Sequence, residues 1–399
     1  MIKKYIPLIL NHTDISFFKK KISVIEKLFT KSYHLNYQDF FINNGDLSLK
    51  KKILHHIYYN NVNCLFIFSH NDNFQLSINF LKKIKKKVKI VFLFMDGFTN
   101  TLIHSRYYAI ISDATITDSE FAHNYFKSMN INSFFLKETL SSMDFSYDKK
   151  LSNKNKIYDI SFIGSFLKEG RKELIDFIKK KKLSYYFLDT SKDQNKISIK
   201  KYQEIIRKTK INLNFSACGN SKYNFFKNFD PFINHGYHQK HRIIEVGFKR
   251  GFVLSEYAFE LEKNWKKDEV IFFYNNQDML KKIFYFLKNQ KKRDLISNNL
   301  FKKCKKKIKI NILNVLVKDA FKSIDRKPRP VIFSQKINLS NYRNLEVTFL
   351  LIYLFKMLKK WKFKSIIFTL NRFLSFNLFH LFWAPINLIR YIYYFYIKN

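Results

Sequence analysis

The sequence has few cysteines, glycines and prolines for its 399 residues. Its three cysteines, Cys64, Cys218 and Cys304, lie far apart and form no CxxC pair. This spacing excludes a disulfide framework and a cysteine-based zinc site, and it fits a reducing, cytoplasmic compartment. The apolar run near the amino terminus stops at Asn11, too early for the hydrophobic region of a secretory signal. We therefore predict that residues 5–10 form a buried strand.

Acidic residues are also scarce: 31 Asp and Glu face 73 Lys and Arg, a formal net charge of +42. Such an excess ordinarily indicates nucleic acid, anionic lipid or a phosphorylated ligand as a partner. Lys, Asn, Ile, Phe and Tyr, whose codons are AT-rich, are all abundant, so genome composition explains much of the charge. Because no recognisable nucleic-acid-binding module accompanies the charge, we expect no specific nucleic-acid partner.

The apolar residues, 46 % of the chain, are enough to form real cores, and the length predicts two or three domains. Short apolar runs alternate with amphipathic segments, the pattern of βα units around a parallel sheet. In the first half these runs are 5–10, 64–68, 88–94 and 108–117. The same alternation resumes at 158 and continues to about 289. The sequence therefore predicts an α/β protein with two doubly wound, Rossmann-like domains in series.

Two polar stretches mark the expected domain boundaries. Residues 144–155 are lysine-rich with no apolar period, and 325–330 carry two prolines that break the preceding helical pattern. These breaks divide the chain into an amino-terminal domain (1–150), a second domain (151–330) and a tail (331–399).

The tail lacks acidic residues beyond Glu346, and its lysines and arginines are interspersed with aromatic rings. This pattern favours attachment in the plane of an anionic membrane surface through residues 346–399. Its longest uncharged window, 373–389, is interrupted by polar residues and a proline and is too short to span a bilayer. The alternative is a helical pair packed on the first domain, with the aromatic rings in its core.

Titratable side chains follow the predicted strands of the first half, at the edge where open parallel sheets bind ligands. They are His12, His70, Asp72 and Asp96. A general base must lie within hydrogen-bond reach of the hydroxyl that it deprotonates. We predict Asp96 as the base and His70 as a second catalytic residue; a turn or cap role for Asp96 remains open.

Two blocks of the second half have the residue types of a phosphate site. In FIGSFLKEGRKELI a strand ends at Gly164, Ser165 makes a turn, and Arg171 opens a helix. Glycine lets the backbone approach a ligand, and arginine at a helix terminus suits phosphate, although a close-packed turn also needs glycine. In KHRIIEVGFKRGFVLSEY, Lys240, Arg242 and Glu245 lie before or within an amphipathic helix that leads into a buried strand.

Both blocks resemble segments of the CgeB-like group 1 glycosyltransferases: their F-I-G-S…R opening and their K-x-R-x-x-E-x-x-x-x-x-G-x-x-L segment. Residues 260–299 are also similar, and 88–97 and 113–132 more faintly so. The resemblance implies the GT-B architecture, with an acceptor domain and a nucleotide-sugar domain facing a cleft. It further implies transfer of a sugar to a hydroxyl of a lipid-linked or cell-surface glycan.

The resemblance also implies roles for single residues. Glu245 matches the carboxylate that takes the ribose hydroxyls of the donor. Arg171 and Arg242 match basic positions near the donor pyrophosphate, and Gly164 and Ser165 match the turn that faces the donor. Each has a plainer alternative: Glu245 as an acid stabilised by the helix dipole, and the arginines as solvated side chains.

A loop between Ser216 and Lys240 is expected to complete the donor site. The run INHGYHQKHR, at the end of this loop, contains three histidines spaced by three residues: His235, His238 and His241. No cysteine or carboxylate completes a metal set, and no D-x-D occurs in the chain, so we predict no metal and no cofactor beyond the nucleotide-sugar co-substrate. Many group 1 enzymes have a second glutamate where this chain has Tyr237, which leaves a retaining mechanism in doubt.

We therefore predict a glycosyltransferase of bacterial cell-envelope polysaccharide biosynthesis, peripheral on the inner face of the cytoplasmic membrane. Two alternatives remain open. One is a GT-B polyol-phosphate transferase of the teichoic-acid type. The other is a non-enzymatic membrane- or RNA-binding protein on a degenerate transferase fold, for which a steep salt dependence of binding is expected.

Overall fold

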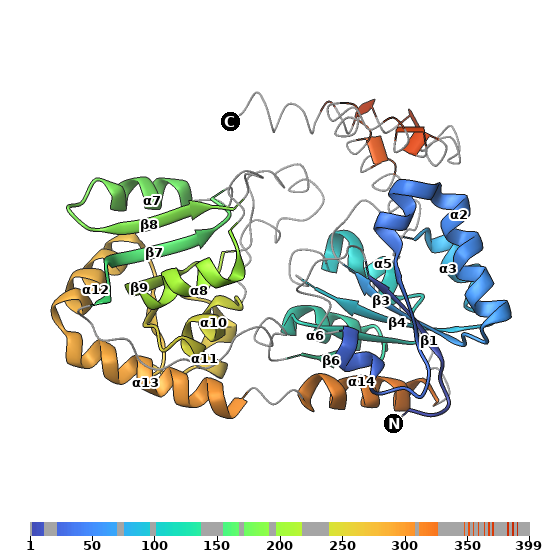
Figure 1. Cartoon of the computed structure of the whole chain (residues 1–399), viewed down its shortest axis with the longest axis horizontal. Coiled ribbons are helices and arrows are strands. Elements are labelled where there is room, and N and C mark those ends of the chain that lie inside the picture. Colours follow the sequence, from blue (N-terminus) through green and yellow to red (C-terminus); the bar gives the residue numbers. More distant parts are fainter. Residues whose placement is uncertain are drawn as a thin grey trace. The chain divides into compact units, whose positions relative to one another are not determined.

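The computed structural model describes residues 2–11, 22–69, 76–95, 101–136, 155–166, 171–190, 197–217, 239–307 and 311–325, together with scattered helical positions between 347 and 389 (Figure 1). The chain divides into two compact units. The first comprises Met1–Lys137 and Ile310–Asn399, and the second comprises Glu138–Lys309.

The first unit is built on a six-stranded parallel sheet with the order β2-β1-β3-β4-β5-β6. Its strands are β1 (Pro7–Asn11), β2 (Tyr33–Asn36), β3 (Cys64–Ser69), β4 (Lys89–Phe94), β5 (Ala114–Thr117) and β6 (Ser133–Phe135). The central strands are buried on both faces, as parallel strands covered by helices must be. From β1 the chain moves outward to β2 and then returns to β3 on the other side of β1, so the order reverses between β1 and β3.

Helices cover one face of this sheet over a single hydrophobic cluster. They are α2 (Tyr37–Tyr59), α3 (Ile78–Ile84), α5 (Arg106–Ala109) and α6 (Glu120–Ser128), with a turn of π-helix, η1 (Thr101–Ser105), before α5. Ser77 and Ser119 cap α3 and α6 by accepting hydrogen bonds from the amides of Phe80 and Ala122. Helix α2 bends at Gly45, whose φ of 82° is a conformation that glycine adopts without strain.

The second unit has a five-stranded parallel sheet with the order β11-β10-β9-β7-β8. Its strands are β7 (Tyr158–Gly164), β8 (Tyr185–Asp189), β9 (Thr209–Asn214), β10 (Val253–Glu256) and β11 (Ile271–Phe273). Its helices are α7 (Arg171–Lys179), α8 (Ile199–Arg207), α10 (Arg242–Phe248), α11 (Phe259–Asn264), α12 (Asn276–Lys288) and α13 (Gln290–Lys307). Here the strand order reverses between β7 and β9, and the carboxyl ends of strands at such a point are where open parallel sheets bind ligands.

Helix α14 (Asn311–Ile324) packs on the first unit. The ring of Phe321 meets the rings of Tyr5 and Phe29 edge to face, each with a centroid distance of 5.1 Å. The Tyr5 hydroxyl donates to Asp325 Oδ1 at 2.7 Å. The sequence predicts the second domain to extend to 330, whereas this helix belongs with the first unit. Residues 308–310 contain no glycine or proline, so no breaker marks the crossing.

The predicted fold class, α/β with two doubly wound parallel sheets, is confirmed. The predicted strand 108–117 is shorter, because the chain forms α5 before β5. In the tail, Leu354 and Ile366 pack into the core cluster of the first unit, whereas Leu358, Phe363 and Ile367 are exposed. Within the described part of the chain, no helix combines the length and the apolar character needed to cross a membrane.

Candidate functional site

The expected ligand crevice of the second unit lies at the carboxyl ends of β7 and β9, where the strand order reverses. Gly164 ends β7, Ser165 follows it, and Ser216 follows β9. Arg171 and Arg242 are the first residues of α7 and α10, the helices that follow these strand ends. Five of the residues predicted from the sequence to bind the donor are therefore brought to one edge of one sheet.

Arg242 lies across the ends of the two central strands. Its guanidinium carbon is 4.5 Å from the centroid of the Phe162 ring, and its Nη1 donates to the Leu213 carbonyl at 3.4 Å. A Cβ at Gly164 would lie 3.2 Å from Arg242 Nη2 and 3.0 Å from the Phe162 ring, so glycine leaves the space that the guanidinium occupies. Arg242 Nε is buried and has no hydrogen-bond partner among the described residues. The guanidinium is therefore a fixed cation at this edge, of the kind that pairs with anionic ligands.

Arg171 has a different environment, because it is buried and its fork binds backbone. Its two terminal nitrogens donate to the carbonyls of Ser165, Phe215 and Ala217, at 2.9, 3.2 and 3.0 Å. The guanidinium therefore joins the turn after β7 to the turn after β9. We describe Arg171 as a positioning residue, and its expected place near a pyrophosphate stays a prediction.

Glu245 is held by a tyrosine from a neighbouring helix. The hydroxyl of Tyr202 on α8 donates to Glu245 Oε2 at 2.7 Å. Burial raises the pKa of Tyr202, and the Glu245 carboxylate raises it further, while Arg242 opposes the shift. Tyr202, Glu245 and Arg242 are thus one polar group, in which the phenol stays protonated and orients the carboxylate.

Glu256 is a carboxyl group at this edge for which the sequence predicts no role. It ends β10, its Oε2 accepts from the Ala217 amide at 2.8 Å, and its carbonyl accepts from the Ser216 hydroxyl at 2.7 Å. Burial raises its pKa above the ordinary 4.5, against the lowering effect of the Ala217 amide, Arg171 and Lys240. In the sequence Glu256 stands at the end of a predicted strand, and this position alone does not distinguish it from a surface glutamate.

This shift predicts a pH dependence of stability. Because the folded-state pKa of Glu256 lies above 4.5, the unfolded chain ionises first as the pH rises, and stability falls from about pH 4.5 up to the folded-state pKa. In Glu256→Gln this loss should disappear while the amide oxygen still accepts from Ala217. Thermal unfolding should then show the variant to be more stable than the parent at about pH 7 but not at about pH 4.

The control is Glu173→Gln, which changes an exposed glutamate of α7. It should follow the parent's profile across the whole pH range. Parallel profiles for the parent and Glu256→Gln would show that Glu256 ionises normally in the folded protein.

The predicted catalytic residues of the first unit, Asp96 and His70, lie outside the described residues, and so do His12 and Asp72. Two buried titratable residues are described at the same edge: His104 in η1, which follows β4, and Asp118, which follows β5. The sequence predicts no role for either. Asp118 gave a weak signal as an acid directly after an apolar run.

Lys240 is partly buried, and its charge acts on Glu256. Of the three histidines in the loop before α10, only His241 belongs to the described residues. Among the residues that the structure describes, no three histidines, cysteines or carboxylates gather in a way that could hold a metal ion.

Residues 158–310 match the family model described as "Glycosyl transferase-like", a stretch that is less than half of the chain. No curated protein matches the chain in sequence. The crystal structure of Anabaena HepE in complex with UDP and glucose is similar, with a TM-score of 0.50 and 8% identity, covering 80% of this chain and 100% of that one.

Two further solved structures are similar at lower TM-scores. TarM has a TM-score of 0.47 and 10% identity, covering 70% of this chain and 58% of TarM. T4 phage BGT in complex with its UDP-glucose substrate has a TM-score of 0.48 and 14% identity, covering 82% of this chain and 100% of that one.

The likeness to HepE extends over both units and concerns the fold alone. The family match covers the second unit, which contains the crevice described above. The predicted fold, GT-B, and the predicted class of enzyme, a glycosyltransferase, are both confirmed. The CgeB-like branch stays a prediction.

Proposed function

We propose that this glycosyltransferase takes its sugar from a uridine diphosphate sugar bound in the crevice of the second unit, and that it belongs to the CgeB-like branch. The observation that carries the proposal is the Tyr202, Glu245 and Arg242 group, which offers an oriented carboxylate beside a fixed cation. The HepE structure, which has the same fold, contains UDP and glucose. A carboxylate suits ribose hydroxyls, and a guanidinium suits a diphosphate.

In the reaction the acceptor oxygen attacks the anomeric carbon of the sugar, and the bond from that carbon to the diphosphate oxygen breaks. Negative charge builds up on the departing diphosphate. Arg242, whose buried Nε has no partner among the described residues, donates to this charge, and Lys240 adds a second positive group. The acceptor proton passes to a base of the first unit, for which Asp96 and His70 are the proposed residues. The proposal requires no metal.

We propose a glycan or a lipid-linked glycan of the bacterial envelope as the acceptor, and attachment of residues 346–399 to the inner face of the cytoplasmic membrane. The described tail positions support such attachment, because Leu358, Phe363 and Ile367 are 46%, 63% and 56% exposed. Exposed apolar side chains among lysines are typical of helices that lie in a membrane interface.

Calorimetric titration of the full chain with UDP, UDP-glucose and CDP-glycerol tests the donor site. The parent should bind a uridine nucleotide, and Glu245→Gln should weaken binding about tenfold, because a hydrogen bond to a charged acceptor becomes a neutral one. Tyr202→Phe should weaken it less, since the carboxylate remains but loses its orienting phenol. Glu204→Gln is the matched control on α8, because Glu204 is paired with Lys208 and makes no described contact in the crevice.

Failure of the folded parent to bind any nucleotide would overturn the proposal. Equal binding by the parent and Glu245→Gln would overturn the assignment of the ribose site. Preference for CDP-glycerol over UDP-sugars would replace sugar transfer by polyol-phosphate transfer.

A further inference from the structure

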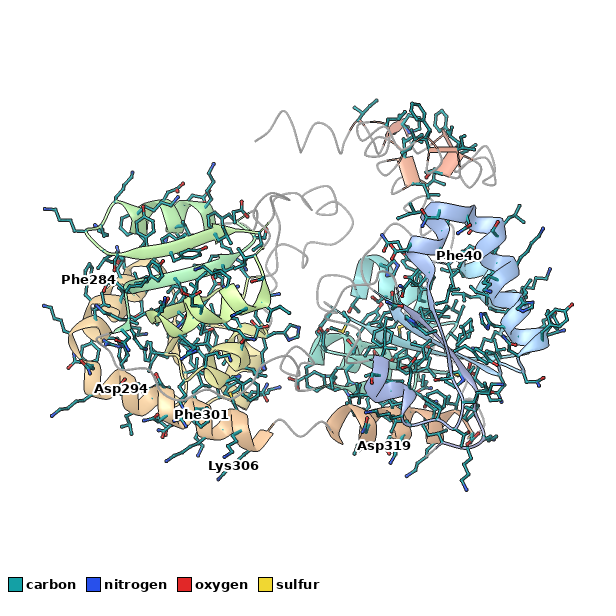
Figure 2. All side chains as sticks on the ribbon, viewed as in Figure 1. Phe40, Phe284, Asp294, Phe301, Lys306 and Asp319 are labelled. Carbon is teal, nitrogen blue, oxygen red and sulfur yellow. The ribbon has the colours of Figure 1, made fainter. Side chains whose placement is uncertain are left out.

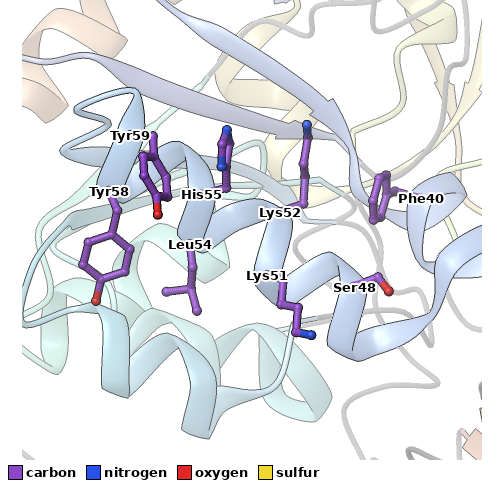
Figure 3. Close-up of a pocket in the computed structure, with 8 residues that line it drawn as sticks. All are labelled: Phe40, Ser48, Lys51, Lys52, Leu54, His55, Tyr58 and Tyr59. Atoms are coloured by element: carbon purple, nitrogen blue, oxygen red, sulfur yellow. The ribbon is translucent and has the colours of Figure 1, made fainter.

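A pocket of about 570 Å³ lies along helix α2 of the first unit (Figure 3). Its described lining consists of Phe40, Ser48, Lys51, Lys52, Leu54, His55, Tyr58 and Tyr59, all from α2. The volume falls in the range of about 300–1,000 Å³ that is usual for small-molecule sites. The donor site belongs to the second unit, so the roles proposed above leave this pocket without one.

The aromatic rings of the pocket are exposed but held in place. Tyr58 and Tyr59 are 54% and 77% exposed. The Tyr59 ring lies on the His55 ring, with centroids 4.8 Å apart and planes 30° apart. Lys87 Nζ sits 4.3 Å above the centroid of Tyr58 and donates to its hydroxyl at 2.9 Å. Exposed rings fixed in this way provide flat apolar faces on which a ring-shaped ligand can stack.

The charge around these rings has one sign. Lys51 and Lys52 line the pocket, and Lys87 borders it. The pocket's described lining includes no acidic residue. Asp46, an acid on the same helix, is largely buried and paired with Lys50. The pocket therefore fits a ligand that carries negative charge as well as apolar ring faces.

The pocket runs along α2, and the direction of this helix relates the pocket to the edges of the sheet. Helix α2 starts directly after β2, at the carboxyl edge of the sheet, and ends shortly before β3 begins at the opposite edge. Phe40 lies in its first turn (Figure 2) and Tyr59 is its last residue. Beyond the bend at Gly45 the helix spans about 20 Å, and most of the lining lies along this part, which leads away from the ligand-binding edge of the sheet. A long ligand with one end at the carboxyl edge could continue along α2.

We propose that this pocket binds an anionic glycan chain, with sugar rings stacked on Tyr58 and Tyr59 and carboxylate or phosphate groups paired with Lys51 and Lys52. The pocket would hold the part of the acceptor remote from the reacting hydroxyl; this link to the acceptor rests on the proposed function. Tyrosine faces with lysines beside them fit a chain of sugar rings that carries anionic groups.

The test is equilibrium binding of the full chain to a long oligogalacturonate and to a neutral malto-oligosaccharide of equal length. The parent should bind the anionic chain and not the neutral one. Lys51→Gln/Lys52→Gln should weaken this binding about tenfold at low salt and flatten its salt dependence. Tyr58→Ser/Tyr59→Ser should weaken it about as much and leave the salt dependence unchanged.

The matched control is Lys291→Gln/Lys292→Gln in α13. There Lys292 donates to the Tyr285 hydroxyl at 3.0 Å, as Lys87 does to that of Tyr58, but these residues do not line the pocket. This variant should bind the oligogalacturonate as the parent does. All variants should keep the parent's thermal unfolding profile, which shows that both units are folded. They should also keep the parent's affinity for UDP, which separates this test from that of the donor site.

Equal oligogalacturonate binding by the parent and both α2 variants would overturn the proposal. A second result would also overturn it: the parent binds vesicles rich in phosphatidylglycerol but not the oligogalacturonate, and the α2 variants lose the vesicle binding. This face of α2 would then be a membrane contact. If the parent binds the oligogalacturonate as described but no nucleotide, the glycan site stands and the proposed donor site fails.

Discussion

Replacement of Arg171 by alanine should destabilise the second unit by about 3 kcal/mol and abolish most of its nucleotide binding. The guanidinium bonds three carbonyls, those of Ser165, Phe215 and Ala217, and is itself only 6% exposed. Without it these carbonyls lose their charged donor, and the turns after β7 and β9 separate. Those turns flank Arg242, so the site and the fold should fail together.

Arg171→Lys should not restore either property. Lysine keeps the charge, but a single ammonium group cannot match the planar fork that reaches three carbonyls on two turns. Denaturant unfolding and calorimetric titration with UDP measure the two effects. Lys179→Ala is the control at the other end of α7, where an exposed ion pair with Asp176 contributes little.

The same pair of measurements separates two roles for Arg171. If Arg171→Ala keeps the parent's stability and loses only UDP binding, the guanidinium is a ligand of the diphosphate, as the resemblance implies. Loss of stability together with binding supports the positioning role. An alanine variant that keeps both would contradict both roles.

The sequence predicted the central strands of the first sheet and missed its edge strand β2. Strands β3 and β4 are nearly continuous apolar runs, because helices cover both sides of the sheet. Strand β2 reads YHLN and is only partly buried, so it carries no comparable run. In helix α2 the backbone angles of Gly45 lie outside the helical region, and the apolar period of the helix is interrupted there. The local apolar pattern thus reports burial, and it was uninformative at edge strand β2 and at the bend of α2.

The candidate site divides in the same way. Gly164, Arg242 and Glu245 could be found because they stand in two short blocks whose residue types and order are informative. Tyr202 comes from α8, far from Glu245 in sequence, and only packing brings its hydroxyl to the carboxylate. Glu256 differs from a surface glutamate through its burial and its bond to the Ala217 amide. Such roles depend on tertiary contacts, which a single sequence does not report.

The packing of α14 on the first unit can be tested with Phe321→Ala. This substitution should lower the free energy of unfolding of the first unit by about 3–5 kcal/mol. Phe321 is 2% exposed and contacts the rings of Tyr5, Phe29 and Phe66. Phe66 is on β3, where alternate side chains point to opposite faces; Leu65 and Ile67 join the cluster under α2, so Phe321 covers the other face. A loss of this size is a large part of a typical domain's stability, so the first unit should open often.

Hydrogen exchange locates that loss in the chain. In Phe321→Ala the amides of β1 and β3 should exchange faster, whereas those of β7 and β9 should keep the parent's rates. Phe286→Ala is the reciprocal variant, because Phe286 is 4% exposed in the core of the second unit and packs on Phe252 with centroids 4.7 Å apart. It should produce the opposite pattern. Faster exchange of β7 and β9 in Phe321→Ala would mean that α14 stabilises the second unit, as a domain boundary at residue 330 predicts.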